Sequence, residues 1–63
     1  MPIAAQTRAL LKTALDEMGE TISRRRLDRL TTICISIWAG DEEAWTHADP
    51  TAREAIRRVL ATA

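Results

Sequence analysis

The chain has 63 residues, with nine basic and nine acidic side chains, so its formal net charge at pH 7 is zero. A chain of this length forms one small domain, which offers no pocket of ordinary enzyme size, and no catalytic constellation is visible in the sequence. The zero net charge excludes a global field that would attract nucleic acid or a membrane surface. We therefore expect a protein that is not an enzyme and that uses no cofactor and no small-molecule substrate.

Cysteine usage and the absence of targeting segments indicate the compartment. Cys34 is the only cysteine, and one unpaired thiol suits a reducing environment. Residues 1–15 lack the basic start and apolar core of a signal peptide, and no apolar run reaches membrane-spanning length. Almost all of the basic residues are Arg, and the chain is rich in Ala. This bias is typical of proteins from GC-rich bacteria. These features predict a cytoplasmic, bacterial protein that does not enter a membrane.

The first helix is predicted over about residues 4–18. Apolar side chains recur at helical spacing along this segment, Ile3 lies near the start of the stripe, and Gly19 is a good terminator. Residues 20–22 then form a short turn, in which Ile22 can pack against the start of the next helix. The stripe consists of Leu10, Leu11, Ala14, Leu15 and Met18.

The most apolar segment, residues 23–40, also carries the densest positive charge and has two interpretations. Ile33, Ile35 and Ile37 alternate with other residues, which is typical of a strand. A helix over about residues 23–39 accounts for more of the segment, because its polar residues then share one face. Ser23 is a suitable N-cap and Gly40 a suitable residue just beyond the C-cap. We therefore favour the helix.

In that helix the apolar residues fill an arc of roughly 200°, wider than the ~100° that a surface helix needs. Such an arc needs neighbours on two sides, and Leu27, Leu30, Cys34 and Ile37 follow the 3-4-3 spacing of a helix pair. A domain this small, without disulfides, is often completed by oligomerisation. We expect a homodimer; the alternative is that the other helices of the chain cover the whole arc. The arc contains Leu27, Leu30, Thr31, Ile33, Cys34, Ile35, Ile37 and Trp38.

Two more helices follow. A short helix over about residues 41–47 can be capped by Asp41, and the carboxylates that follow suit the dipole of its first turn. The last helix is predicted over about residues 50–62, with Asp49 as N-cap, Pro50 at the first position and a supporting Glu54–Arg58 pair. Its apolar face extends to Ala63. The fold class is all-α: a small bundle of three main helices plus a short connecting helix, completed by self-association.

The sharpest chemical feature is a run of arginines, Arg24, Arg25 and Arg26, with Arg29 one turn later. The run occupies the start of a predicted helix, where the dipole disfavours positive charge, and a broken local rule can mark a functional site. One interpretation is a site for DNA phosphate, RNA or an acidic protein surface. The other is pairing with carboxylates of the same or a second copy, namely Asp16, Glu17, Glu20, Asp41, Glu42 and Glu43.

Part of this segment resembles the second half of a helix-turn-helix motif. The pattern Ile22-Ser23-x-x-x-Leu27-x-x-Leu30 matches it over about ten residues, with arginines on the reading face. The first half departs from the motif, because its turn glycine is expected just before Ile22 and Gly19 stands two residues too early. The predicted helix is also longer than a recognition helix.

The remaining candidate residues favour structural roles. In a chain without Phe or Tyr, Trp38 is expected to fill one end of the core, and Trp45 fits a core or an interface equally well. Cys34 is expected to be a buried thiol. His47 and Asp49 suggest a base with an orienting carboxylate, but no nucleophile stands beside them, so an exposed loop histidine is the expectation. No spacing of ligands indicates a metal site.

The sequence thus predicts a small protein–protein interaction module that acts as a regulator, inhibitor or adaptor. It would use an apolar helix face with an adjacent Arg cluster. The alternative is a dimeric DNA-binding transcriptional regulator with a helix-turn-helix-like element at residues 22–30. Under the first hypothesis a protein partner and a second copy bind; under the second, nucleic acid binds. The predicted apolar face for self-association or a partner is Leu27, Leu30, Cys34, Ile37, Trp38 and Trp45.

Overall fold

The computed structural model describes residues 4–62; Ile3 and Ala63, which were assigned to the apolar faces of the first and last helices, lie outside them. Three α-helices and one 3₁₀ helix follow each other along the chain: α1 (Ala4–Glu17), α2 (Arg24–Trp38), η1 (Glu42–His47) and α3 (Pro50–Thr62). The described residues contain no strand, so the helical interpretation of residues 31–38 is confirmed. The predicted all-α bundle with a short connecting helix is confirmed as well.

Glycine and capping side chains set the helix ends as predicted. Gly19 has a φ of 75° and Gly40 a φ of 102°, a conformation that glycine adopts without a Cβ penalty. Beyond α2, Gly40 N–H donates to the Ile37 carbonyl and Asp41 N–H donates to the Ser36 carbonyl, both at 3.0 Å, which satisfies two carbonyls that the helix leaves free. Ser23 Oγ accepts from the Arg26 N–H at 3.1 Å and thereby caps the start of α2.

The predicted cap of the short helix is wrong. Asp41 makes no side-chain hydrogen bond at the start of η1. Its φ of −84° and ψ of 87° differ from the extended conformation in which an N-cap side chain reaches back to the first turn. Instead the backbone closes the turn, because Ala44 N–H donates to the Asp41 carbonyl at 3.2 Å. The Asp41 carboxylate is therefore left on the surface.

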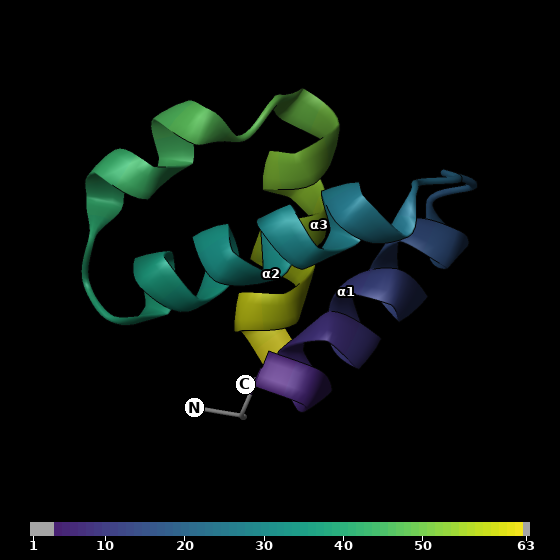
Figure 1. The fold of residues 1–63 in the computed structure, drawn as a ribbon, viewed down its shortest axis with the longest axis horizontal. Coiled ribbons are helices and arrows are strands. Elements are labelled where there is room, and N and C mark those ends of the chain that lie inside the picture. The colour runs from purple at the N-terminus through teal and green to yellow at the C-terminus, as the bar shows by residue number, and fades with distance from the viewer. Residues whose placement is uncertain (1–3, 63) are drawn as a thin grey trace.

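Helix α2 is the centre of the structure and contacts all three other helices. Figure 1 shows α1 along one side of α2, α3 crossing behind it at a steep angle, and η1 returning beside its C-terminal half. The core lies where α1, α2 and α3 meet, and within residues 4–62 every buried side-chain nitrogen or oxygen has a hydrogen-bond partner. The buried apolar residues are Leu11, Ala14, Leu15, Leu27, Leu30, Ile33, Cys34, Ala44, Ala48, Ala52, Ala55, Ile56 and Val59.

The wide apolar arc of α2 is covered mainly by the chain itself. Leu27, Leu30 and Cys34 are all buried against the other helices, so the arc does not require a second copy. Trp38 is the exception, with 43% of its surface exposed. The expectation that Trp38 closes one end of the core is therefore wrong. The reason is visible in Figure 1, where the C-terminal end of α2 extends past α3 and only η1 lies beside it.

Candidate interaction surface

The ion pairs of the structure separate the charged residues into two groups. Nine basic and nine acidic side chains form four ion pairs within residues 4–62, which leaves five of each sign outside an ion pair. The unpaired basic residues are Arg24, Arg25, Arg29, Arg53 and Arg57, and the unpaired acidic residues are Glu17, Glu20, Asp41, Glu42 and Glu43.

Two of the five unpaired arginines are engaged by Trp45. Arg53 Nε donates to the Trp45 carbonyl at 3.2 Å, and the Arg57 guanidinium lies 5.5 Å from the centre of the indole ring, within the range of a cation–π interaction. Trp45 itself is half-buried against the core. Both arginines therefore hold η1 against α3 and serve the fold.

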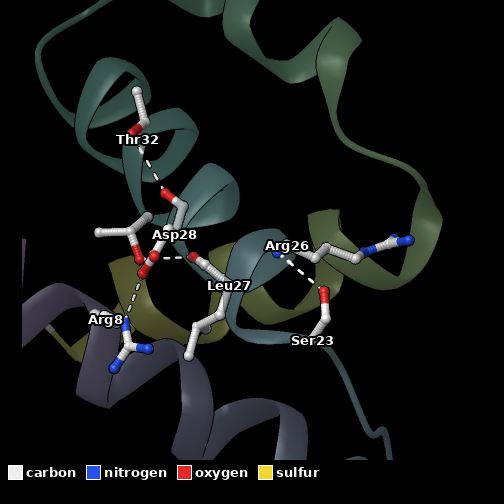
Figure 2. A network of polar contacts seen from close by, with 7 residues as sticks. Arg8, Ser23, Arg26, Leu27, Asp28 and Thr32 are labelled. Carbon is white, nitrogen blue, oxygen red and sulfur yellow. Dashed lines mark hydrogen bonds and ion pairs between the residues drawn. The ribbon is translucent and has the colours of Figure 1, made fainter.

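Arg26, the third residue of the predicted cluster, is also used inside the chain. Its side chain extends away from α2 in Figure 2 and forms an ion pair with Asp49, at the start of α3. The Asp49 carboxylate also accepts from the Ala52 N–H at 2.8 Å, which makes it the N-cap of α3. The Ala52 N–H and, after it, Arg26 hold the pKa of Asp49 below its usual range. Asp49 was not among the carboxylates expected to pair with the arginines.

Arg24, Arg25 and Arg29 remain, and we call these three residues the basic surface. All three are exposed on the first two turns of α2, and none forms an ion pair within residues 4–62. Arg24 shares a hollow with Asp16 and Glu20 but lies within ion-pair distance of neither. The structure thus divides the predicted cluster: Arg26 pairs inside the chain, and the other three are open to solvent at the positive end of the helix dipole.

The folded chain also brings His47 to the side of Arg29. Arg26, Arg29, Leu30, His47 and Asp49 line a shallow hollow of about 150 Å³ between α2 and the end of η1. His47 is exposed, as predicted. Asp49 is committed to α3 and to Arg26, so it does not orient the imidazole. Among residues 4–62, the hollow is lined by one arginine without an ion pair, Arg29, and by no nucleophile.

A second open charged set follows the other end of α2. Asp41, Glu42 and Glu43 are exposed, and none forms an ion pair within residues 4–62. We call them the acidic surface. From the sequence, these residues are predicted only as a cap, as dipole partners and as candidate partners of the arginines. The signal that it missed was their position, directly beyond the helix that begins with the basic surface.

The residues of the predicted apolar face, like those of the arginine cluster, are partly used inside the chain and partly accessible. Leu27, Leu30 and Cys34 lie in the core, where burial raises the pKa of the Cys34 thiol. Ile37 is half-buried, and Trp38 is exposed. The apolar surface that a partner can reach is therefore the C-terminal end of α2. Trp38 lies about 14–21 Å along the helix from the residues of the basic surface at ~1.5 Å per residue, so the two are not adjacent as the sequence suggested.

An ion pair that was not predicted from the sequence joins α2 to α1. Arg8 Nε donates to Asp28 Oδ1 at 2.7 Å, as Figure 2 shows. Asp28 lies among the arginines in sequence, but its carboxylate is turned to α1 and does not neutralise the basic surface. The arginines therefore make the net charge of this part of the α2 surface positive.

Neither a metal site nor a membrane span is found in the described part of the chain. Residues 4–62 hold no group of three His, Cys, Asp or Glu side chains that could bind a metal ion, and none of their helices is long and apolar enough to cross a bilayer. Comparison of the sequence and fold with protein-family models, with curated proteins and with solved structures finds no match.

Proposed function

We propose that this chain is a small protein–protein interaction module, which acts by binding and not by catalysis, as a regulator, inhibitor or adaptor. Its surface for a partner lies on α2, where the basic surface occupies the first two turns and Trp38 lies at the C-terminal end. The observation that carries the proposal is the exposure of Trp38 at 43%. It is the only large hydrophobic side chain classed as exposed within residues 4–62, in a fold that buries the others at least in part.

Trp38 supports binding because tryptophan combines a large contact area with few rotatable bonds, and it is enriched among the residues that dominate interface energies. Two further apolar residues near it on α2, Ile35 and Ile37, are half-buried and so partly accessible. An exposed apolar side chain on its own is common. Its position near two further apolar residues and the acidic surface, which follows the end of α2, is what favours a partner.

The basic surface supports the same role through electrostatics. Unpaired charges on a rim attract an oppositely charged partner and raise the rate of association more than they raise affinity. The free thiol of Cys34 is buried, and a protein that relies on one unpaired cysteine suits a reducing compartment. We therefore place this interaction in the cytoplasm.

The experiment is a capture assay with the immobilised chain in a lysate of the organism that encodes it, read by quantitative mass spectrometry. The variants are Trp38→Ala and Arg24→Ala/Arg25→Ala/Arg29→Ala, with circular dichroism to check the fold. The control is Lys12→Ala, which removes an exposed cation of α1 that lies 3.3 Å from Asp16. A partner of this surface is lost with both variants and kept with the control. If every protein captured by the wild type is captured equally by both variants, the proposal is refuted.

DNA binding is the second candidate, and the observation that favours it is the position of the basic surface on the first two turns of α2, where a recognition helix contacts its site. Two features weigh against it. The turn between α1 and α2 covers residues 18–23, longer than the roughly 3–4 residues of a helix-turn-helix, and Arg26 is engaged by Asp49.

A fluorescent duplex of random sequence tests this alternative by anisotropy at low salt. Binding that weakens steeply with salt, and that is lost in Arg24→Ala/Arg25→Ala/Arg29→Ala, would assign the basic surface to phosphates, because each neutralised phosphate releases counterion. Arg26 is kept in this variant since its ion pair supports the fold. No binding at high protein concentration would leave the protein-partner proposal in place.

A further inference from the structure

The basic and acidic surfaces lie at opposite ends of the same helix. Each consists of three exposed residues, and none of the six forms an ion pair within residues 4–62. Along α2, the basic residues lie about 14–21 Å from the last residue of the helix, beyond which the acidic surface follows, at ~1.5 Å per residue. This distance is well beyond the reach of an ion pair, so within one chain the two surfaces cannot neutralise each other. In number and sign they are nevertheless complementary.

We propose that two copies of the chain pair through antiparallel α2 helices, so that the basic surface of each copy meets the acidic surface of the other. A two-fold axis produces this arrangement. When the basic surface of one copy contacts the acidic surface of the other, the symmetry also brings the acidic surface of the first to the basic surface of the second. The carboxylates of one copy then lie over the positive end of the other copy's helix dipole, where anions are favoured. This inference rests on the proposed interaction role and names a second copy as the partner.

The size of the molecule indicates a weak dimer. A stable interface of standard size removes about 800 Å² from each partner, and the chain has 4194 Å² of accessible surface in total. An interface of standard size would therefore take about a fifth of the whole surface of the chain. One side of a single helix supplies less than that. The association is therefore expected in the micromolar range or weaker, and it should weaken steeply with salt because its charges are exposed.

Charge exchange tests the pairing directly, with the oligomeric state measured by sedimentation equilibrium at low salt. The wild type should form a dimer. Arg25→Glu/Arg29→Glu should raise the dissociation constant at least about tenfold, and Glu42→Lys/Glu43→Lys should do the same, because each places like charges opposite one another. The fourfold variant, which combines both exchanges, has the net charge of the wild type and should return to within about threefold of its dissociation constant.

A matched variant separates the acidic surface from overall charge. Glu17→Lys/Glu20→Lys alters net charge as Glu42→Lys/Glu43→Lys does, at two exposed residues that also form no ion pair within residues 4–62, and it should keep the dimer. Circular dichroism of each variant checks that the helices remain.

A wild type that stays monomeric at high concentration and low salt overturns the inference. So does a fourfold variant that dissociates as readily as either double variant, or a control that dissociates as readily as Glu42→Lys/Glu43→Lys. If the dimer fails while capture of another protein still depends on Trp38 and the basic surface, the interaction role stands with a different partner. If the dimer forms while capture of other proteins shows no such dependence, the proposed function is refuted and the dimer stands on its own.

Discussion

Replacing Arg25 by Glu should stabilise the folded chain, although it removes a residue of the proposed binding surface. Arg25 is exposed and forms no ion pair within residues 4–62, so the change breaks no contact of that kind. Arg and Glu have nearly equal helix propensity. At the second residue of α2, however, the dipole disfavours a cation and favours an anion by about 0.3 kcal/mol or more each.

The neighbour one turn along the helix adds to this effect. Arg29 follows Arg25 at i,i+4, so two like charges now repel each other by about 0.2–0.5 kcal/mol, and Arg25→Glu turns this repulsion into an attraction of similar size. The lower bounds of the dipole and pair effects together give about 1 kcal/mol, which for a domain of this size raises the melting temperature by roughly 4–8 °C.

Thermal unfolding followed by circular dichroism at low salt measures this gain. Arg25→Gln should give about half of it, because it removes the cation without adding an anion, and 1 M salt should remove most of it by screening. A lower melting temperature for Arg25→Glu at low salt, measured at a protein concentration below the dissociation constant of any dimer, would refute the reasoning. It would mean that Arg25 stabilises the fold through a contact other than an ion pair within residues 4–62.

Three further predictions concern the fold that supports the surface. Asp49→Ala should lower the free energy of unfolding by about 1–2 kcal/mol, because the cap of α3 is lost. Asp49→Asn keeps the cap and should lose mainly the exposed ion pair with Arg26, about 0–1 kcal/mol. Chemical denaturation measures both values. The pKa of Asp49 is lowered in the folded state. Its contribution to stability is therefore present above the unfolded pKa of about 3.9 and is lost as pH falls through the folded pKa. The same denaturation repeated at low pH should detect this loss, and Asp49→Asn should abolish the pH dependence. The Cys34 thiol should react with Ellman's reagent only as fast as the chain opens, since it is buried; immediate reaction of the native protein would contradict its placement. Ile56→Ala should cost about 2–5 kcal/mol, a large part of the roughly 3–9 kcal/mol expected for a chain of this length, so calorimetry should show a poorly folded protein.

The helix bounds could be predicted from the sequence because local chemistry determines them. Gly19 and Gly40 adopt positive φ and end two helices, and Ser23 and Asp49 cap the helices that follow. Each of these signals acts within a few residues of itself. The observed elements accordingly differ from the predicted ranges by one residue or less at every end.

The surface could not be predicted in the same way, because it depends on which segments meet in space. The pairing of Arg26 with Asp49 joins residues on α2 and at the start of α3, and the exposure of Trp38 depends on where α3 crosses α2. A helical wheel gives the width of the apolar arc, but it does not show how far along the helix the neighbours extend. The arc suggested a partner along the whole of α2, whereas the structure leaves only the end with Trp38 open.

The position of the arginines links folding to binding in one last prediction. A marginally stable domain keeps cations at the start of α2, where they cost about 1 kcal/mol, and that cost disappears when a partner's carboxylates lie over them. Association with a second copy should therefore raise stability with concentration. Tenfold above the dissociation constant the gain is about 1.4 kcal/mol, or roughly 5–11 °C in melting temperature for a domain of this size. Calorimetry over a wide concentration range at low salt should show this rise for the wild type and a melting temperature independent of concentration for Arg25→Glu/Arg29→Glu. A wild-type melting temperature independent of concentration would show that the cost is not recovered by a second copy.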